Sequence, residues 1–219
     1  MRKLYFGYIS PYSRKIRVVL AEKGLDYEKE VLHFGSAPKS ADAVNPARRV
    51  PVLVDGDRTL FESNVIIDYL LQTYPDNAAP DRPPLAPALA RPEHRWDDWQ
   101  TLVGIETMLD SGLNLLFLRN DGITPEHSPF LARELNRTQV LLDWLEGRAT
   151  PEGFIPGQFS IQDLNFVIAV QWSDYRHMFP WRGRPRLEAI VERYRERPSV
   201  AGTVPELNPP DTPGREPDK

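Results

Sequence analysis

A proline-rich segment divides the sequence into two parts of different character. Residues 75–92 contain six prolines and few aromatic side chains. Because proline lacks a backbone N–H and interrupts helices and central strands, such a segment favours an extended connection. Before it, strand-like and helix-like runs alternate, whereas after it the apolar residues recur only at helical spacing. We therefore expect two domains, at 1–77 and 93–205, joined by a linker at 78–92.

The first domain is predicted to mix strands and helices. Serine is a favoured N-cap residue and proline a favoured first helical residue. One helix is therefore expected to begin at Pro11 with Ser10 as its cap, and a second is expected from Ser63 onward. A turn around Gly56 between two apolar runs predicts a hairpin. The expected strands lie at 4–6, 27–32, 52–54 and 59–61, with a further helical turn at 40–44. The opening strand, helix and strand form the parallel unit that needs a crossover helix.

The second domain is predicted to contain helices only, because no strand pattern interrupts it. The helices are expected at 93–118, with a break near Gly112, and at 131–145, 160–178 and 185–197. Ser160 and Asp163 have the spacing of a capping box, and Phe159 and Leu164 that of a hydrophobic staple, which indicates a folding determinant. Residues 206–219 are rich in proline and charge and are expected to form a flexible tail.

Composition excludes several kinds of chemistry. The chain has no cysteine, so disulfides and cysteine nucleophiles are ruled out, and any thiol must come from a ligand. The formal net charge is −4 with both signs interspersed, which argues against a nucleic acid or a membrane surface as partner. The histidines show no metal-ligand spacing, so no metal is expected. Neither a run of about 18 apolar residues nor a secretory signal is evident, and a cytoplasmic location is expected.

Ser10 is the first residue with chemical potential. It places a hydroxyl at a strand-to-helix turn, facing the positive end of the helix dipole. A serine hydroxyl is too weak an acid to ionise by itself at neutral pH, so it cannot act alone as a base. It can, however, donate a hydrogen bond to a thiolate and so lower the pKa of the thiol. The alternative is that Ser10 only caps the helix, and taken alone this alternative is favoured.

Two further motifs flank the predicted hairpin. Arg49, Val50 and Pro51 precede a strand, and a trans proline would be the ordinary interpretation, since only about 5–6% of X–Pro bonds are cis. Glu62 and Ser63 lie where the second strand of the hairpin gives way to a helix. There the helix N-terminus could hold a carboxylate and Glu62 an ammonium, as in an amino-acid head group; a capped helix with a solvated glutamate is the alternative.

Together, in this order and with a helical second half, these motifs resemble the cytosolic glutathione S-transferase family. The resemblance extends over residues 3–205 and is strongest from Asn45 to Leu70, with a further family-like ending at Arg197-Pro198-Ser199-Val200. It implies a thioredoxin-like α/β N-terminal domain, an all-α C-terminal domain and glutathione as co-substrate.

The resemblance also implies roles for individual residues. Val50, before a cis Pro51, would pair through its backbone with the cysteinyl part of glutathione. Glu62 and Ser63 would hold the γ-glutamyl end. Arg49 would lie near the glycine carboxylate, with Lys39 as a looser candidate.

Ser10 stands where family members place a catalytic serine or cysteine. The segment Ser10-Pro11-Tyr12-Ser13 is similar to the redox motif Cys-Pro-Tyr-Cys with serine in place of cysteine. Disulfide and deglutathionylation chemistry is therefore not available. Ser13 is the second candidate for the thiolate contact, and Tyr5 and Tyr8 are the third.

The function implied by the resemblance is transfer of glutathione to an electrophile, or a related isomerisation, dehalogenation or ether cleavage. The electrophile pocket is expected beside Ile9, Tyr12, Met108 and Ser111, and a homodimer is expected. The alternative is a non-catalytic module of this fold used for protein association, as in some stress-protein domains. Intact Val-Pro and Glu-Ser motifs favour the enzyme, because a scaffold need not keep a tripeptide site.

Overall fold

The chain forms two compact units. The computed structural model describes residues 1–32, 45–74, 84–87 and 90–205. The first unit comprises Met1–Arg82 together with Pro198–Lys219, and the second comprises Pro83–Arg197. The expected turn at 40–44, the tail at 206–219 and part of the linker lie outside the described residues.

The first unit is built on a four-stranded mixed sheet with the order β2-β1-β3-β4. β1 is parallel to β2 and antiparallel to β3, and β3 is antiparallel to β4. The strands are β1 (Arg2–Phe6), β2 (Glu28–Val31), β3 (Val52–Asp55) and β4 (Arg58–Phe61). This arrangement confirms the predicted strands and the thioredoxin-like sheet.

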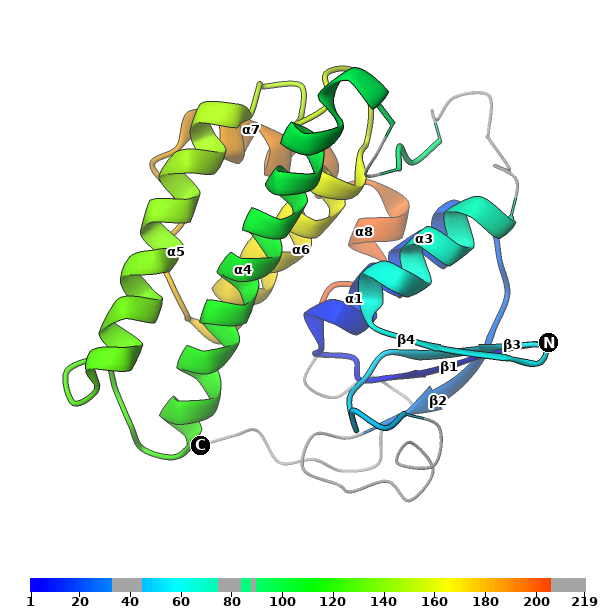
Figure 1. Ribbon diagram of the computed structural model, residues 1–219, viewed down its shortest axis with the longest axis horizontal. Coiled ribbons are helices and arrows are strands. Elements are labelled where there is room, and N and C mark those ends of the chain that lie inside the picture. Colours follow the sequence, from blue (N-terminus) through cyan, green and yellow to red (C-terminus); the bar gives the residue numbers. More distant parts are fainter. Residues whose placement is uncertain (33–44, 75–83, 88–89, 206–219) are drawn as a thin grey trace. The chain divides into compact units, whose positions relative to one another are not determined.

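Helices α1 (Pro11–Glu22) and α3 (Ser63–Thr73) pack against each other over one face of this sheet (Figure 1). Leu4 and Phe6 of β1 are fully buried, as are Ile16 and Val19 of α1 and Ile66 of α3. Residues two apart on a strand share one face, as do residues three or four apart on a helix. These side chains therefore point into one core. The same core therefore sets how both helices lie on the sheet.

A short helix from the far end of the chain completes this unit. Helix α8 (Pro198–Ala201) packs on α1 (Figure 1). The expectation that residues up to 205 belong with the helical domain thus differs from the observed unit, which takes in the chain from Pro198 onward. The physical reason is a set of hydrogen bonds between α1 and this segment, described below.

The second unit is helical, as predicted. Its elements are η1 (Pro92–His94), α4 (Arg95–Asn120), α5 (Pro129–Arg148), α6 (Ile161–Arg176) and α7 (Pro185–Tyr194). Helix α4 packs against both α5 and α6 (Figure 1). Among the described residues of this unit there is no strand, only two isolated bridges, Ala86 with Ser160 and Thr150 with Gly153.

Helix α4 runs unbroken through Gly112, so the predicted break there was wrong. A Cβ atom at Gly112 would lie 2.8 Å from Phe179 and 3.1 Å from Trp172. The glycine therefore serves close packing and does not interrupt the helix. By length and composition, residues Pro92–Asn120 could cross a membrane, but 56% of the most apolar window is buried, as in the core helix of a globular protein.

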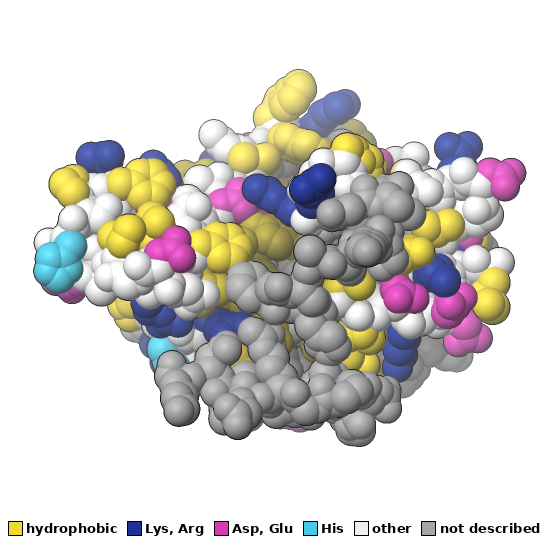
Figure 2. Space-filling model, turned by 90° about the horizontal axis from the view of Figure 1, so that it is seen from below, with side chains coloured by type: hydrophobic (Ala, Val, Ile, Leu, Met, Phe, Trp, Pro, Cys, Tyr) yellow, Lys and Arg dark blue, Asp and Glu magenta, His cyan; other side chains and the backbone are white. Residues whose placement is uncertain are grey.

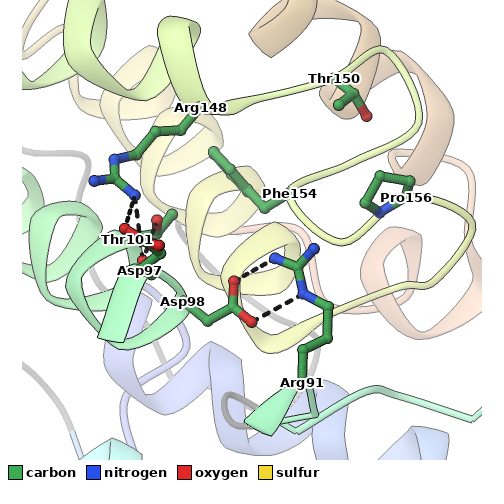
Figure 3. Close-up of a pocket in the computed structure, with 8 residues that line it drawn as sticks. All are labelled: Arg91, Asp97, Asp98, Thr101, Arg148, Thr150, Phe154 and Pro156. Carbon is green, nitrogen blue, oxygen red and sulfur yellow. Dashed lines mark hydrogen bonds and ion pairs between the residues drawn. The ribbon is translucent and has the colours of Figure 1, made fainter. Parts of the chain in front are cut away.

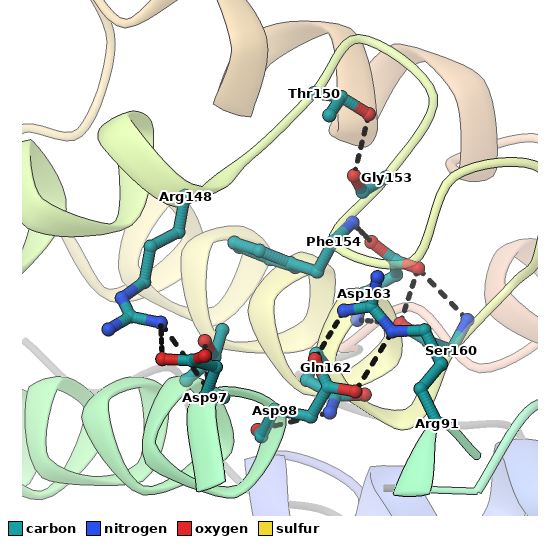
Figure 4. Close-up of polar contacts among 11 residues, drawn as sticks. Arg91, Asp97, Asp98, Arg148, Thr150, Gly153, Phe154, Ser160, Gln162 and Asp163 are labelled. Atoms are coloured by element: carbon teal, nitrogen blue, oxygen red, sulfur yellow. Dashed lines mark hydrogen bonds and ion pairs between the residues drawn. The ribbon is translucent and has the colours of Figure 1, made fainter. Parts of the chain in front are cut away.

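A capping box begins α6, as the sequence predicted (Figure 4). Asp163 accepts hydrogen bonds from the backbone N–H groups of Phe154 and Ser160, each at 2.9 Å, and from the Ser160 hydroxyl at 2.6 Å. Gly153, at φ 129°, brings its backbone so close that a Cβ would lie 3.0 Å from the carboxylate. Burial raises the pKa of Asp163 to about 6, and the hydrogen bonds oppose that rise.

Replacing Asp163 with alanine should lower the free energy of unfolding by about 2–6 kcal/mol, because two buried N–H groups would lose their acceptor at about 1–3 kcal/mol each. Urea denaturation would measure the loss. The control is Asp143→Ala, which removes a carboxylate that is 72% exposed and paired with Arg184. Its expected cost is below about 1 kcal/mol. Equal losses in the two variants would contradict the prediction.

Candidate functional site

The register of the sheet brings three sequence motifs to one end of the first unit. Tyr5 of β1 pairs with Val52 of β3, and Val52 pairs with Phe61 of β4. Because β3 is antiparallel to both neighbours, β1 and β4 end where β3 begins. The residues after β1, before β3 and after β4 therefore meet at the same end of the sheet.

Two helices also begin at this end of the sheet. Helix α1 follows β1 with Ser10 as its N-cap, and α3 follows β4 with Glu62 as its N-cap. The N-terminus of a helix carries unsatisfied N–H groups and about half a positive charge. Two such termini at one end of a sheet favour an anionic ligand there.

Ser10 and Ser13 have different environments. Ser10 is half-buried, and its Oγ accepts a hydrogen bond from the Ser13 N–H at 3.2 Å. Within the described residues this is the only hydrogen bond of the Ser10 side chain, so the hydroxyl proton is left to donate. Ser13 is fully buried, and its Oγ accepts from the Gly7 N–H at 3.4 Å. Which of the two serines contacts a thiolate stays a prediction, with Ser10 preferred.

The two tyrosine candidates lie on and just after β1. Tyr5 is half-buried and alternates with the buried Leu4 and Phe6, so it faces away from the helices. Tyr8 packs edge to face on Phe6 with a centroid separation of 5.0 Å. The Arg17 guanidinium lies 4.9 Å from the Tyr8 ring centroid. The ring of Tyr8 therefore makes a cation–π contact with Arg17.

The loop before β3 is ordered by Asn45, which the sequence analysis did not single out. Asn45 is 1% exposed; its Nδ2 donates to the Arg49 carbonyl at 2.7 Å, and its Oδ1 accepts from the Ala47 N–H at 2.8 Å. An Asn-Pro dipeptide is a known turn signal and could have identified this role. The Val50–Pro51 bond is cis, with Val50 half-buried and Arg49 exposed.

Glu62 and Ser63 form the junction between β4 and α3. Glu62 is exposed and has φ 67° and ψ 120°, a conformation that L-residues rarely adopt. Ser63 is 5% exposed, and its side chain makes no hydrogen bond within the described part of the chain. Strained backbone of this kind costs about 1–3 kcal/mol and is found mainly at functional sites.

Comparison with known proteins supports the assignment of this fold. Residues 4–78 match the family model described as Glutathione S-transferase, N-terminal domain. A solved glutathione S-transferase from Methylobacterium radiotolerans, in complex with glutathione sulfonate, is 25% identical with a TM-score of 0.78, covering 95% of this chain and 96% of that one. The chain therefore has the glutathione S-transferase fold, with the N-terminal domain of that family at residues 4–78.

The curated relatives of this chain carry names of two kinds. The chain is 38% identical to a stringent starvation protein A homolog of Haemophilus influenzae, over 90% of this chain and 87% of that protein. It is 27% identical to glutathione S-transferase Z1 of Arabidopsis thaliana, over 94% and 93% of the two chains. The matches to stringent starvation protein A homologs of Haemophilus ducreyi and Histophilus somni cover less than half of those proteins, 45% and 37%.

The residues expected to line an electrophile pocket are distributed over both units. Met108 and Ser111 of α4 are 0% and 1% exposed. Ser111 Oγ accepts a hydrogen bond from Arg137 of α5 at 3.5 Å. Ile9 and Tyr12 are half-buried in the first unit, and Lys39 lies outside the described residues.

The helical unit has a small pocket of its own, about 230 Å³ in volume (Figure 3). Arg91 and Asp98 line it and form a two-pronged ion pair, with Nε donating to Oδ2 at 3.0 Å. The hydrogen bond with Asp98 raises the pKa of Arg91. Arg148, on the other side, donates to Asp97 and Gln100. Since a carboxylate already holds each guanidinium, these contacts secure the first turns of α4.

The part of the chain that the structure describes shows no metal site. It contains no cluster of three or more histidine, aspartate or glutamate side chains that could hold an ion. On the face drawn in Figure 2, basic and acidic side chains are interspersed with apolar ones.

The conformation of Glu62 leads to a stability prediction. Glycine accepts a positive φ without steric cost, whereas alanine keeps a Cβ. Glu62→Gly should therefore be more stable than Glu62→Ala by about 1 kcal/mol, which is the strain relieved less the larger entropy of glycine in the unfolded chain. Guanidinium denaturation of the two variants measures this difference. If the alanine variant were equally stable, Glu62 would not be strained.

Proposed function

We propose that this protein is a glutathione transferase, which binds glutathione where α1 and α3 begin and stabilises its thiolate with Ser10 for attack on an electrophilic small molecule. The observation that carries the proposal is the convergence of two helix N-termini and the loop before Pro51 at one end of the sheet. Solved relatives from Methylobacterium radiotolerans and Pseudomonas fluorescens, the latter 24% identical, hold glutathione sulfonate and glutathione respectively.

The proposed chemistry depends on stabilising the thiolate of glutathione more than its thiol. A free thiol has a pKa of about 8.5, so only a small fraction is thiolate at neutral pH. The Ser10 hydroxyl can donate to the thiolate while its Oγ accepts from the Ser13 N–H. That hydrogen bond and the α1 dipole both favour the anion, and each unit of pKa lowering corresponds to about 1.4 kcal/mol.

The remaining residues have chemistry suited to the rest of the tripeptide. Val50 precedes the first paired residue of β3, so its backbone groups lie outside that ladder and can pair with a peptide. Glu62 offers an exposed carboxylate to an ammonium, and the Ser63 hydroxyl has no other partner among the described residues. Arg49 is exposed and can contact a carboxylate.

A non-catalytic role in protein association is the second candidate. The observation that favours it is the 38% identity, over most of both chains, to a protein named as a stringent starvation protein A homolog. A transferase must bind glutathione at the tripeptide site, whereas a protein used only for association need not. Retention of the pure protein on immobilised glutathione, followed by a panel of electrophiles, separates them: retention with turnover supports the transferase, and neither retention nor turnover supports association.

Ser10→Ala should raise the pKa of bound glutathione and slow conjugation by about 10²-fold, the scale seen when a single anion-stabilising donor is removed. Affinity for glutathione should change little, because the hydroxyl acts on the thiolate and not on the rest of the tripeptide. Ultraviolet titration of the thiolate in the complex, together with steady-state rates, measures both effects.

Three control variants complete this experiment. Ser13→Ala should alter the titration much less, since the Ser13 hydroxyl is buried against Gly7. Glu62→Ala and Ser63→Ala should mainly weaken binding. If Ser10→Ala leaves both the titration and the rate unchanged, Ser10 is only a helix cap, and Ser13, Tyr5, Tyr8 or backbone amides must stabilise the thiolate.

We also propose a homodimer, with an apolar stripe on α4 as part of its interface. Trp96, Trp99 and Val103 lie three and four residues apart on one face of this helix and are 76%, 46% and 47% exposed. Tryptophan is enriched among residues that dominate interface energies. A second copy of this chain is the partner that the family resemblance implies.

Light scattering should report twice the chain mass of 25.1 kDa for the wild type. Trp96→Glu combined with Trp99→Glu should yield the single-chain mass at micromolar concentration, because two charges would be buried in an apolar contact. Val140→Glu, at a 58% exposed position on α5, is the matched control and should leave the dimer intact. A wild-type monomer, or a dimer that survives both tryptophan changes, would contradict the proposal.

A further inference from the structure

A buried arginine connects the first helix to the end of the chain. Arg14 of α1 is 1% exposed. Its Nε donates to Thr203 Oγ1 at 3.2 Å, and its Nη2 donates to the Val200 carbonyl at 3.0 Å. These residues are separated by 189 and 186 positions in the sequence, yet they lie in the same compact unit. We call Val200 and Thr203 the C-terminal anchor.

Arg14 is also joined to the turn that carries Ser10. Its backbone N–H donates to the Ser10 carbonyl at 3.0 Å, the bond that closes the first turn of α1. Ser13, the residue before it, donates its N–H to Ser10 Oγ. A guanidinium held at two points therefore fixes the backbone that aims the Ser10 hydroxyl.

Burying this charge is costly, which calls for a reason beyond packing. Burial is the main cause that lowers the pKa of Arg14, to about 9, and the nearby charge of Arg17 adds to the effect. Replacing buried charged groups with apolar residues of similar volume is often neutral or stabilising. A cation in the first turns of α1 attracts an anion near the N-terminus of that helix by direct charge interaction.

We propose that Arg14, held by the C-terminal anchor, is a positioning residue for the thiolate site at Ser10. The anchor, although encoded at the far end of the chain, would then belong to the machinery that activates glutathione. This inference rests on the proposed function, since it presumes a thiolate beside Ser10.

Four variants test the proposal. Arg14→Met removes the charge and both donors at similar volume. Arg14→Lys keeps the charge but replaces the planar fork with a single ammonium. Thr203→Val removes one acceptor of the fork. Ser199→Ala is the matched control: the Ser199 hydroxyl donates to Glu22 in the last turn of α1, so this variant loosens the same pair of elements away from Ser10.

The measurements are the pKa of bound glutathione by ultraviolet titration, kcat and KM separately, and urea unfolding. Arg14→Met should raise the thiol pKa by about one unit and lower kcat about tenfold with little change in KM. Arg14→Lys should restore part of the pKa shift and Thr203→Val should lose part of it. Ser199→Ala should reduce stability while the thiol pKa remains that of the wild type.

Two results would overturn the inference and are distinguishable from each other. If Arg14→Met and Thr203→Val change stability alone, with the thiol pKa unchanged, Arg14 is a structural residue while the thiolate site stands. If Arg14→Met does not fold, Thr203→Val and Arg14→Lys decide the question by the same readout. If the wild type itself does not lower the pKa of bound glutathione, the proposed function fails first.

Discussion

The pairing of β3 between β1 and β4 is the constraint on which the first unit depends. With Tyr5, Val52 and Phe61 in one row, two strands end and one begins at the same end of the sheet. A slip of one residue would turn the buried face of a strand toward solvent, so the apolar side chains of β1 hold this register. Because each helix follows its strand directly, both helix N-termini reach the same place.

Costly local features gather at that end of the sheet. Glu62 adopts a positive φ, and Arg14 carries a buried charge. Each of these would be avoided in a unit selected for stability alone. Their concentration around one end of the sheet is the pattern expected where structure serves a ligand, and it is independent of the comparison with relatives.

The helical unit distributes its polar interactions differently. The buried carboxylate of Asp163 caps α6 and holds the loop at Phe154. Asp98 is consumed in its ion pair with Arg91 (Figure 4). Satisfied networks of this kind specify a fold but leave no group to react. The exposed tryptophans of α4 take no part in these networks.

The sequence by itself determined the features that depend on neighbours along the chain. Strand and helix positions, the capping box of Ser160 and Asp163, and Ser10 as the cap of α1 all follow from local propensity and short-range hydrogen bonds. The cis bond before Pro51 was reached through a family motif, since the residues alone favoured trans.

Only the tertiary structure decided what depends on contacts between distant segments. Glycine stands inside α4 at position 112 because Phe179 and Trp172 leave no room for a Cβ, and Ser111 is buried beside Arg137 of α5. Arg14 gave no local signal, since its partners are nearly the whole chain away. Local patterns record the backbone preference of a segment, whereas the partner of a side chain is set by how segments pack, and that is a property of the folded chain alone.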